Sequence, residues 1–155
     1  MRVIVVAVGK MRGELADAVR VYERRAGRYW KLEVIEVPQA SARTAAPVQV
    51  KDAEAQRILA RIPTHVDVVA LTRDGEGMDS SALARWMEQK AVESSPGVAF
   101  VIGGAFGLGA PVLDRARRRL SLSDMTLPHE MARLFLTEQL YRAGTILRGE
   151  PYHKG

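Results

Sequence analysis

Four glycines stand close together in the stretch VIGGAFGLGAPVL, at positions 103, 104, 107 and 109. They follow an apolar run and precede a segment that can begin a helix. Glycine-rich turns in this position often hold a nucleotide or a nucleotide-like cofactor, because backbone without Cβ atoms can approach a ligand closely. The same glycines also suit a tight turn that needs positive φ and binds nothing. Both interpretations remain open from this stretch alone.

Two known glycine motifs do not match. The dinucleotide fingerprint G-x-G-x-x-G belongs to a first strand–helix turn, whereas these glycines read G-G-x-x-G-x-G after a later strand. Asp124 lies twenty residues beyond Gly104 but falls in a loop. The phosphate loop ends in G-K-[ST], which is absent. A nicotinamide oxidoreductase stays as an alternative, which a fluorescence titration with NADH would test.

Other catalytic constellations are missing. The three histidines are far apart in the chain, and there is no cysteine to support a metal site. The segment HEMAR begins like a zinc-protease helix, but Arg133 stands where the second histidine is needed. The hydrolase motif G-x-S-x-G is also absent. We expect no metal and no serine hydrolase.

Composition and charge narrow the class of protein further. The chain has 155 residues, which suits a single domain over 1–155. Its net charge is +5, and 18 of its 23 basic residues are arginine. Arginine binds phosphate and stacks on bases, so a nucleic-acid partner is one explanation. The other is a GC-rich coding bias that replaces lysine by arginine on a solvated surface.

The arginines cluster in two places, each predicted to be helical. One cluster contains Arg24, Arg25 and Arg28, and the other contains Arg115, Arg117, Arg118 and Arg119.

The apolar run near the N-terminus is only about six residues long, which is too short for a signal peptide or a membrane span. We therefore expect a cytoplasmic protein with no membrane contact.

Hydrophobic periodicity predicts alternating strands and helices. The predicted strands are 3–8, 32–37, 66–71, 98–102 and 119–122, and the predicted helices are 13–28, 50–61, 80–92, 111–117 and 129–148. Residues 39–49 are predicted to be a flexible loop and 72–78 a turn-rich loop. This alternation indicates an α/β fold with a mainly parallel sheet and helices on both faces. Ligands bind at the carboxyl ends of such strands, which here lie at Leu71, Gly103 and the loop after 122.

Several long motifs carry a family resemblance. They are FVIGGAFGLG, LSLSDMTLPHEMARL, the helix HEMARLFLTEQLYRAGTILRG, the early VAVGK and the terminal PYHKG. Together they make nearly the whole chain similar to the RlmH-type family of SPOUT methyltransferases, which act on ribosomal RNA. The resemblance implies an α/β domain with a C-terminal trefoil knot. It also implies S-adenosyl-L-methionine as cofactor, held by Leu71, Gly103, Leu122, Ser123, Asp124, Met125, Thr126 and Leu127.

The resemblance also implies a substrate and an assembly. The substrate would be N3 of a pseudouridine in a hairpin loop of large-subunit ribosomal RNA, within the ribosome. The protein would be a homodimer in which each active site draws residues from both chains. A non-catalytic RNA-binding dimer with the same fold is the alternative. The long helix has apolar residues on more than one face, which indicates either a partner surface or deep burial.

Four residues are the catalytic candidates. Arg142 follows Glu138 by one helical turn, so the two form either an ordinary ion pair or a cation oriented to hold negative charge. Tyr152 and His153 lie in a terminal tail that is either frayed or able to stack on a base and handle its proton. His129, at the start of the last helix, is expected to serve capping or packing. Gly144, inside that helix, should cost about 1 kcal/mol relative to alanine.

Overall fold

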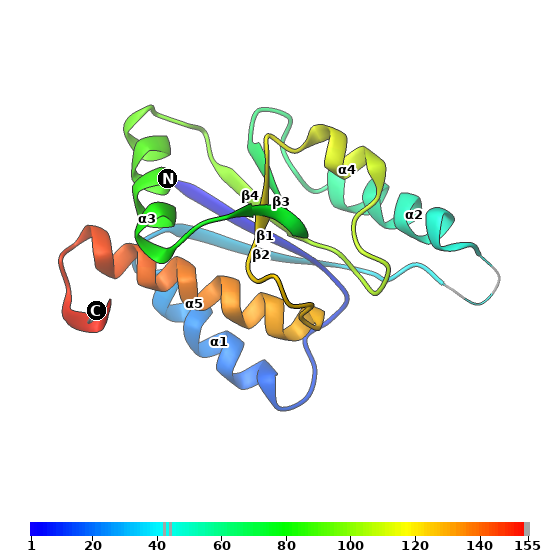
Figure 1. Cartoon of the computed structure of the whole chain (residues 1–155), viewed down its shortest axis with the longest axis horizontal. Coiled ribbons are helices and arrows are strands. Elements are labelled where there is room, and N and C mark those ends of the chain that lie inside the picture. Colours follow the sequence, from blue (N-terminus) through cyan, green and yellow to red (C-terminus); the bar gives the residue numbers. More distant parts are fainter. Residues whose placement is uncertain (42, 44, 154–155) are drawn as a thin grey trace.

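The computed structural model describes residues 1–41, 43 and 45–153. Its elements alternate along the chain (Figure 1). The strands are β1 (Arg2–Val8), β2 (Lys31–Val37), β3 (Asp67–Gly77), β4 (Val98–Ile102) and β5 (Arg118–Ser121). The helices are α1 (Leu15–Ala26), α2 (Pro47–Leu59), α3 (Ser80–Val92), α4 (Ala110–Arg115) and α5 (His129–Leu147), followed by a 3-10 turn at Pro151–His153.

The strands form one sheet in the order β2-β1-β4-β3-β5, and every neighbouring pair is parallel. Helices α1, α3 and α5 cover one face, and α2 and α4 cover the other (Figure 1). The predicted α/β architecture with helices on both faces is therefore confirmed. The trefoil knot stays a prediction.

The buried strands supply a core on each side of the sheet. In β1, Val3 and Val5 pack under α1, α3 and α5, whereas Ile4 and Val6 pack under α2 and α4. Phe100, in β4, is completely buried in the first of these layers. Successive side chains of a strand point to opposite faces, so a strand covered on both sides must be apolar throughout. The continuous apolar run near the N-terminus is explained in this way.

The structure changes one loop prediction. Residues 72–77 are the second half of β3, which continues past a bulge instead of ending at Leu71. Leu71 and Glu76 both pair with Leu120, so four residues loop out between them. A Cβ on Gly75 would lie 2.8 Å from the backbone of Arg119, which explains the glycine at this crossing. The predicted turn residues therefore serve the bulge.

Two further boundaries differ from prediction. Helix α2 begins at Pro47 and not at residue 50, because proline is well suited to the first helical position. The predicted flexible loop partly falls on residues 42 and 44, which lie outside the described residues. Arg117, Arg118 and Arg119 are not helical: the backbone turns extended at Ala116, and the chain then enters β5 beside β3.

Helix α5 is fastened to the sheet by a buried cation. The Arg133 side chain, only 8% exposed, donates to Glu36 of β2 at 2.6 Å and to Glu23 of α1 at 2.9 Å. Burial by itself would raise the pKa of Glu36, but hydrogen bonds from Arg133 and from the Met11 backbone lower it below its ordinary value. This contact fixes the first turns of α5.

Within the described residues, no helix is both long and apolar enough to cross a membrane.

Candidate active site

A cavity of about 330 Å³ opens at the carboxyl edge of the sheet. Its walls come from the bulge after Leu71, the glycine turn after β4, the loop after β5 and the first turn of α5. Cofactor pockets commonly measure about 300–1,000 Å³, and in open α/β sheets they lie at this edge. The cavity is therefore large enough for a small cofactor.

Seven of the eight predicted cofactor residues line this cavity. They are Leu71, Gly103, Leu122, Ser123, Met125, Thr126 and Leu127. Residues from three separate loops are thus brought together as the strand ends predicted. Asp124 is the exception, because it is exposed and does not line the cavity.

The glycine turn folds back on itself. Gly104 and Gly107 form an isolated β-bridge, and Gly107 has a φ of 84°. A Cβ on Gly103 would lie 2.8 Å from the carbonyl carbon of Gly107, so only glycine lets the two segments touch. Behind the turn, the buried carboxylate of Glu54 lies against Gly104 and accepts a hydrogen bond from the Ala40 backbone at 3.1 Å. The glycines make both a tight turn and one wall of the cavity.

The loop after β5 is held by its own serines. The Ser121 hydroxyl donates to the Ser123 carbonyl at 2.9 Å, and the Ser123 hydroxyl accepts from the Met125 backbone at 2.9 Å. Such side-chain turns replace backbone ladders where a strand has ended. The loop is therefore shaped before any ligand arrives, with Leu122 and Leu127 on the cavity wall.

One buried polar atom at the cavity has no partner. The Thr72 hydroxyl oxygen is shielded from solvent, yet makes no hydrogen bond to any described residue. Thr72 lines the cavity beside Leu71. A buried hydroxyl without a partner costs about 1–3 kcal/mol, so such a group calls for a ligand or a water. The cavity thus offers apolar walls, glycine backbone and a free hydroxyl.

Sequence reasoning missed several cavity residues. Thr72 and Arg73 were assigned to a turn-rich loop, and Leu108 and His129 received structural roles or none, yet all four line the cavity. His129 does not cap α5; its Nε2 lies 2.7 Å from Glu130, and the N-cap is Pro128. The position of Thr72 next to Leu71, at a strand end, was the available signal for it. No sequence signal pointed to Leu108.

Three of the four catalytic candidates, Glu138, Arg142 and Tyr152, contact one another in a separate cluster, and His153 follows Tyr152 in the chain. Glu138 Oε1 accepts two hydrogen bonds from Arg142, from Nε at 3.0 Å and from Nη2 at 2.6 Å. The same oxygen accepts from the Tyr152 hydroxyl at 2.9 Å. The Arg142 guanidinium also lies 4.9 Å from the centre of the Tyr152 ring. Tyr152 is therefore packed on α5, and the expected ion pair between Glu138 and Arg142 is present.

The contacts within the cluster raise the pKa of two of its groups, Arg142 and Tyr152. The hydrogen bonds to Glu138 raise the pKa of Arg142. Burial is the main cause that raises the pKa of Tyr152, followed by hydrogen bonds with Tyr22 and Glu138. His153 Nδ1 is buried without a partner among the described residues. The cluster therefore contains a guanidinium that stays charged and a phenol that stays protonated, beside a histidine whose Nδ1 is buried without a partner among the described residues.

In one chain the cluster lies further along α5 than the cavity, from the middle of the helix towards its C-terminal end. His129 lines the cavity, whereas Glu138 and Arg142 follow it by nine and thirteen residues. At 1.5 Å per residue these side chains stand about 14 and 20 Å further along the helix. Figure 1 shows the C-terminal turn at the far end of α5. The predicted site residues are thus brought into two groups and not one.

The fold is an α/β fold with a parallel sheet, and its main cavity lies at the carboxyl edge of the strands, where such folds bind their ligands. A family model described as "Predicted SPOUT methyltransferase" matches residues 1–153. The chain belongs to the SPOUT methyltransferase family. Among the described residues, no group of three histidine, aspartate or glutamate side chains is placed to hold a metal ion.

Curated relatives cover the whole chain. A protein of Gemmatimonas aurantiaca named "Ribosomal RNA large subunit methyltransferase H" is 54% identical over 155 residues, which are 99% of this chain and 100% of the relative. Proteins with the same name from an Anaeromyxobacter species and from Listeria monocytogenes are 50% and 43% identical, also over 99% of this chain and 100% of theirs.

A solved structure agrees with the fold. The crystal structure of a probable methyltransferase from Bordetella pertussis Tohama I superimposes with a TM-score of 0.57. The match covers 92% of this chain and 95% of the other at 18% identity, so it speaks for the fold alone. The resemblance inferred from the motifs is confirmed by the family match and the curated relatives.

Proposed function

We propose that this protein transfers a methyl group from S-adenosyl-L-methionine to N3 of a pseudouridine in large-subunit ribosomal RNA. The observation that carries the proposal is the cavity, whose walls contain seven of the eight residues expected to hold the cofactor. The names of the curated relatives favour catalysis over a non-catalytic RNA-binding role. Action on ribosomal RNA would place the protein in the cytoplasm.

The cavity fits the cofactor by its chemistry. Leu71, Leu122 and Leu127 offer apolar surface to a flat adenine ring, and the glycine turn lets backbone groups approach the ribose and methionine parts. The Thr72 hydroxyl is free to bond a polar atom of the ligand. When bound, S-adenosyl-L-methionine supplies an activated methyl group on a sulfonium.

The residues of the second cluster would handle the base. The target N3–H is a weak acid, so its proton must leave and the negative charge on the ring needs stabilisation. Arg142, oriented by Glu138, would hold that charge or a nearby phosphate. Tyr152 would stack on the base, and the free nitrogen of His153 would take the proton.

A homodimer would bring the two groups together. The cavity and the cluster are about 14–20 Å apart along one helix, so a single chain cannot present both to one nucleotide. The solvent side of α5 carries Met131 and Phe135, which are 43% and 41% exposed, on the same stripe as Glu138 and Arg142. Two copies paired through this stripe would place the tail of one chain over the cavity of the other.

Cofactor binding and transfer test the proposal separately. Titration calorimetry should show binding of S-adenosyl-L-methionine, and Gly103→Ala should weaken it at least tenfold because the new Cβ would collide with Gly107. Labelled cofactor and large ribosomal subunits lacking the modification should yield one methylated pseudouridine, located by mapping the base. No binding at high micromolar cofactor, or binding without transfer, would contradict the proposal.

Mixed dimers test the shared site. Gly103→Ala damages only the cavity, and Arg142→Ala damages only the cluster, so each variant alone should be inactive. Random exchange of the two should restore roughly a quarter of the sites, because half of the dimers would each contain one intact site. Activity no higher than that of the separate variants would show that each chain works alone.

A further inference from the structure

One group of cations takes no part in the proposed site. Arg117, Arg118 and Arg119 lie on or just before β5, the last strand of the sheet. This strand is four residues long. Short, charged edge strands discourage pairing with other chains. Carboxylates would serve that purpose equally well, so the uniformly positive charge needs a further explanation.

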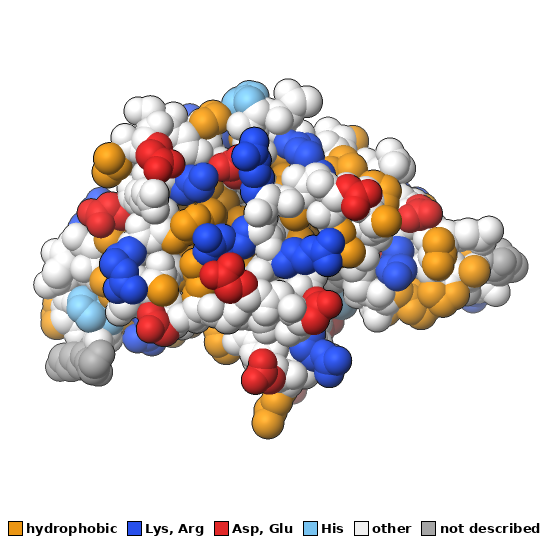
Figure 2. Space-filling view, turned by 45° about the horizontal axis from the view of Figure 1, so that its top comes forward, with side chains coloured by type: hydrophobic (Ala, Val, Ile, Leu, Met, Phe, Trp, Pro, Cys, Tyr) orange, Lys and Arg blue, Asp and Glu red, His pale blue; other side chains and the backbone are white. Residues whose placement is uncertain are grey.

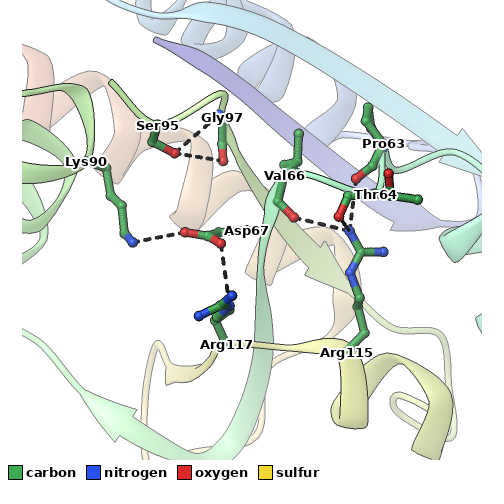
Figure 3. Close-up of polar contacts among 9 residues, drawn as sticks. All are labelled: Pro63, Thr64, Val66, Asp67, Lys90, Ser95, Gly97, Arg115 and Arg117. Carbon is green, nitrogen blue, oxygen red and sulfur yellow. Dashed lines mark hydrogen bonds and ion pairs between the residues drawn. The ribbon is translucent and has the colours of Figure 1, made fainter. Parts of the chain in front are cut away.

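Arg115, the arginine just before this group, is bound to the fold. Arg115 Nη2 donates to the carbonyl oxygens of Pro63, Thr64 and Val66 at 2.9, 3.3 and 3.2 Å (Figure 3). These contacts fasten the end of α4 to the chain that enters β3. Arg115 therefore has a structural role and is excluded from any binding surface.

Arg118 also serves the fold. Its guanidinium lies 5.0 Å from the centre of the Trp86 ring, and its Nη1 lies 3.8 Å from Glu76. Its side chain is only 27% exposed. The contacts hold β5 against α3, so this side chain is largely occupied.

Arg117 and Arg119 are the exposed members of the group. Arg117 is 80% exposed and lies 3.7 Å from Asp67, a carboxylate that Lys90 already contacts at 2.9 Å (Figure 3). Arg119 is exposed and makes no ion pair with any described residue. Arg117 directly precedes β5 and Arg119 is its second residue, so the two exposed side chains are close neighbours at this edge of the sheet.

This pair is continuous with the cavity. The β3 bulge carries Arg73, which is exposed and lines the cavity. The same bulge touches β5, because the backbone of Arg119 lies against Gly75. Figure 2 shows this side of the molecule, where Lys and Arg side chains gather across the middle with acidic side chains around them. A basic path thus runs from the cavity along the outer side of β5.

We propose that this basic edge, formed by Arg73, Arg117 and Arg119, binds the phosphate backbone of the RNA strand next to the target nucleotide. The inference rests on the proposed function and extends it to the surface that positions the substrate. An arginine guanidinium can donate two parallel hydrogen bonds to one phosphate. Phosphate contacts fix the register of a nucleic acid without reading its sequence. An acidic protein is the less suitable partner, because binding it would not require the basic side chains to begin at the cofactor cavity.

Removing the two charges tests the proposal. Arg117→Gln with Arg119→Gln should raise KM for large ribosomal subunits about tenfold and leave kcat and cofactor affinity unchanged. Each lost phosphate contact should also reduce the slope of log affinity against log salt by about 0.7, the value for single strands. Arg117→Lys with Arg119→Lys should keep most of the affinity, because the charges remain.

The control is Arg20→Gln with Arg24→Gln on α1, which changes the net charge equally at the opposite part of the sheet. It should leave KM and the salt slope unchanged; an equal rise in KM would overturn the proposal, since total charge would then be the cause. Unchanged KM in the β5 variant, or a shift to a smaller species in sedimentation, would also overturn it. Absence of transfer by the unchanged protein would overturn the proposed function as well.

Discussion

Gly144 shows how one residue can reverse its expected effect. In a helix interior glycine is worse than alanine by about 1 kcal/mol. Here a Cβ on Gly144 would lie 2.3 Å from Cγ of Tyr29, so the ring occupies the space where a side chain would stand. The Tyr29 hydroxyl donates to Glu150, just before the tail, and that hydrogen bond raises its pKa. The glycine admits the aromatic group that supports the tail.

Gly144→Ala should therefore destabilise the protein by about 1–3 kcal/mol, the usual range for overpacking a well-filled site. Urea unfolding measures the change. In the background of Tyr29→Gly, which removes both the ring and the Cβ that would lie 2.6 Å away, the same substitution should become stabilising, because only the helix preference remains. A gain in stability in the unchanged background would contradict the close contact.

The Tyr152 hydroxyl should stabilise the fold in a pH-dependent way. Tyr152→Phe should lower the free energy of unfolding by about 1 kcal/mol at pH 8, since it removes the hydrogen bond to Glu138. Because folding raises the pKa of this phenol, its contribution is complete below the unfolded pKa of about 10 and is lost as pH rises through the folded value. Urea unfolding of both proteins from pH 8 upward should show the difference shrinking; a growing difference would refute it.

At the scale of elements, the position of α5 governs both groups of proposed site residues. Its first turn lines the cavity, and its second half begins with Glu138 and carries Arg142. The helix is held at its start by Arg133, which joins it to α1 and β2. Weakening that joint should loosen the cavity as well as the fold.

Glu36→Gln should lower stability at pH 7 by about 1.5 kcal/mol, because a charged hydrogen bond is lost at a partly exposed site. The lowered pKa of Glu36 means that its contribution is present above the unfolded pKa of about 4.3 and is lost as pH falls through the folded value. The difference between the two proteins should therefore vanish in acid. Cofactor affinity, measured by calorimetry, should fall with it.

Glu33→Gln is the matched control on the same strand. Glu33 pairs with Arg2 where both side chains are over a third exposed, so its loss should change stability by less than about 0.5 kcal/mol. Equal losses of stability in the Glu36 and Glu33 variants would show that the hydrogen bond from Arg133 to Glu36 stabilises the fold no more than a surface ion pair does.

At the scale of the whole molecule, the proposed dimer decides whether a complete site exists. Met131→Glu with Phe135→Glu would place charges in the proposed interface. Sedimentation should show a monomer, transfer to ribosomal subunits should fall more than tenfold, and cofactor binding should persist because the cavity belongs to one chain. Val92→Glu, at a side chain that is 78% exposed on α3, should change none of these. A dimer that survives the double change would place the interface elsewhere.

Local patterns in the sequence were enough for the parallel α/β sheet, the positions of most elements and the three strand ends that meet at the cavity. The family resemblance supplied the eight expected cofactor residues, seven of which line the cavity. Strand and helix periods, glycine spacing and the rule that ligands bind at strand ends all act over short stretches of chain. Only the tertiary structure showed that Thr72 and Leu108 line the cavity, that Tyr29 fills the space at Gly144, and that Arg115 and Arg119 have different surroundings. The tertiary structure also separated the cavity from the tail cluster. These features depend on the pairing of distant segments, and no local pattern contains that register.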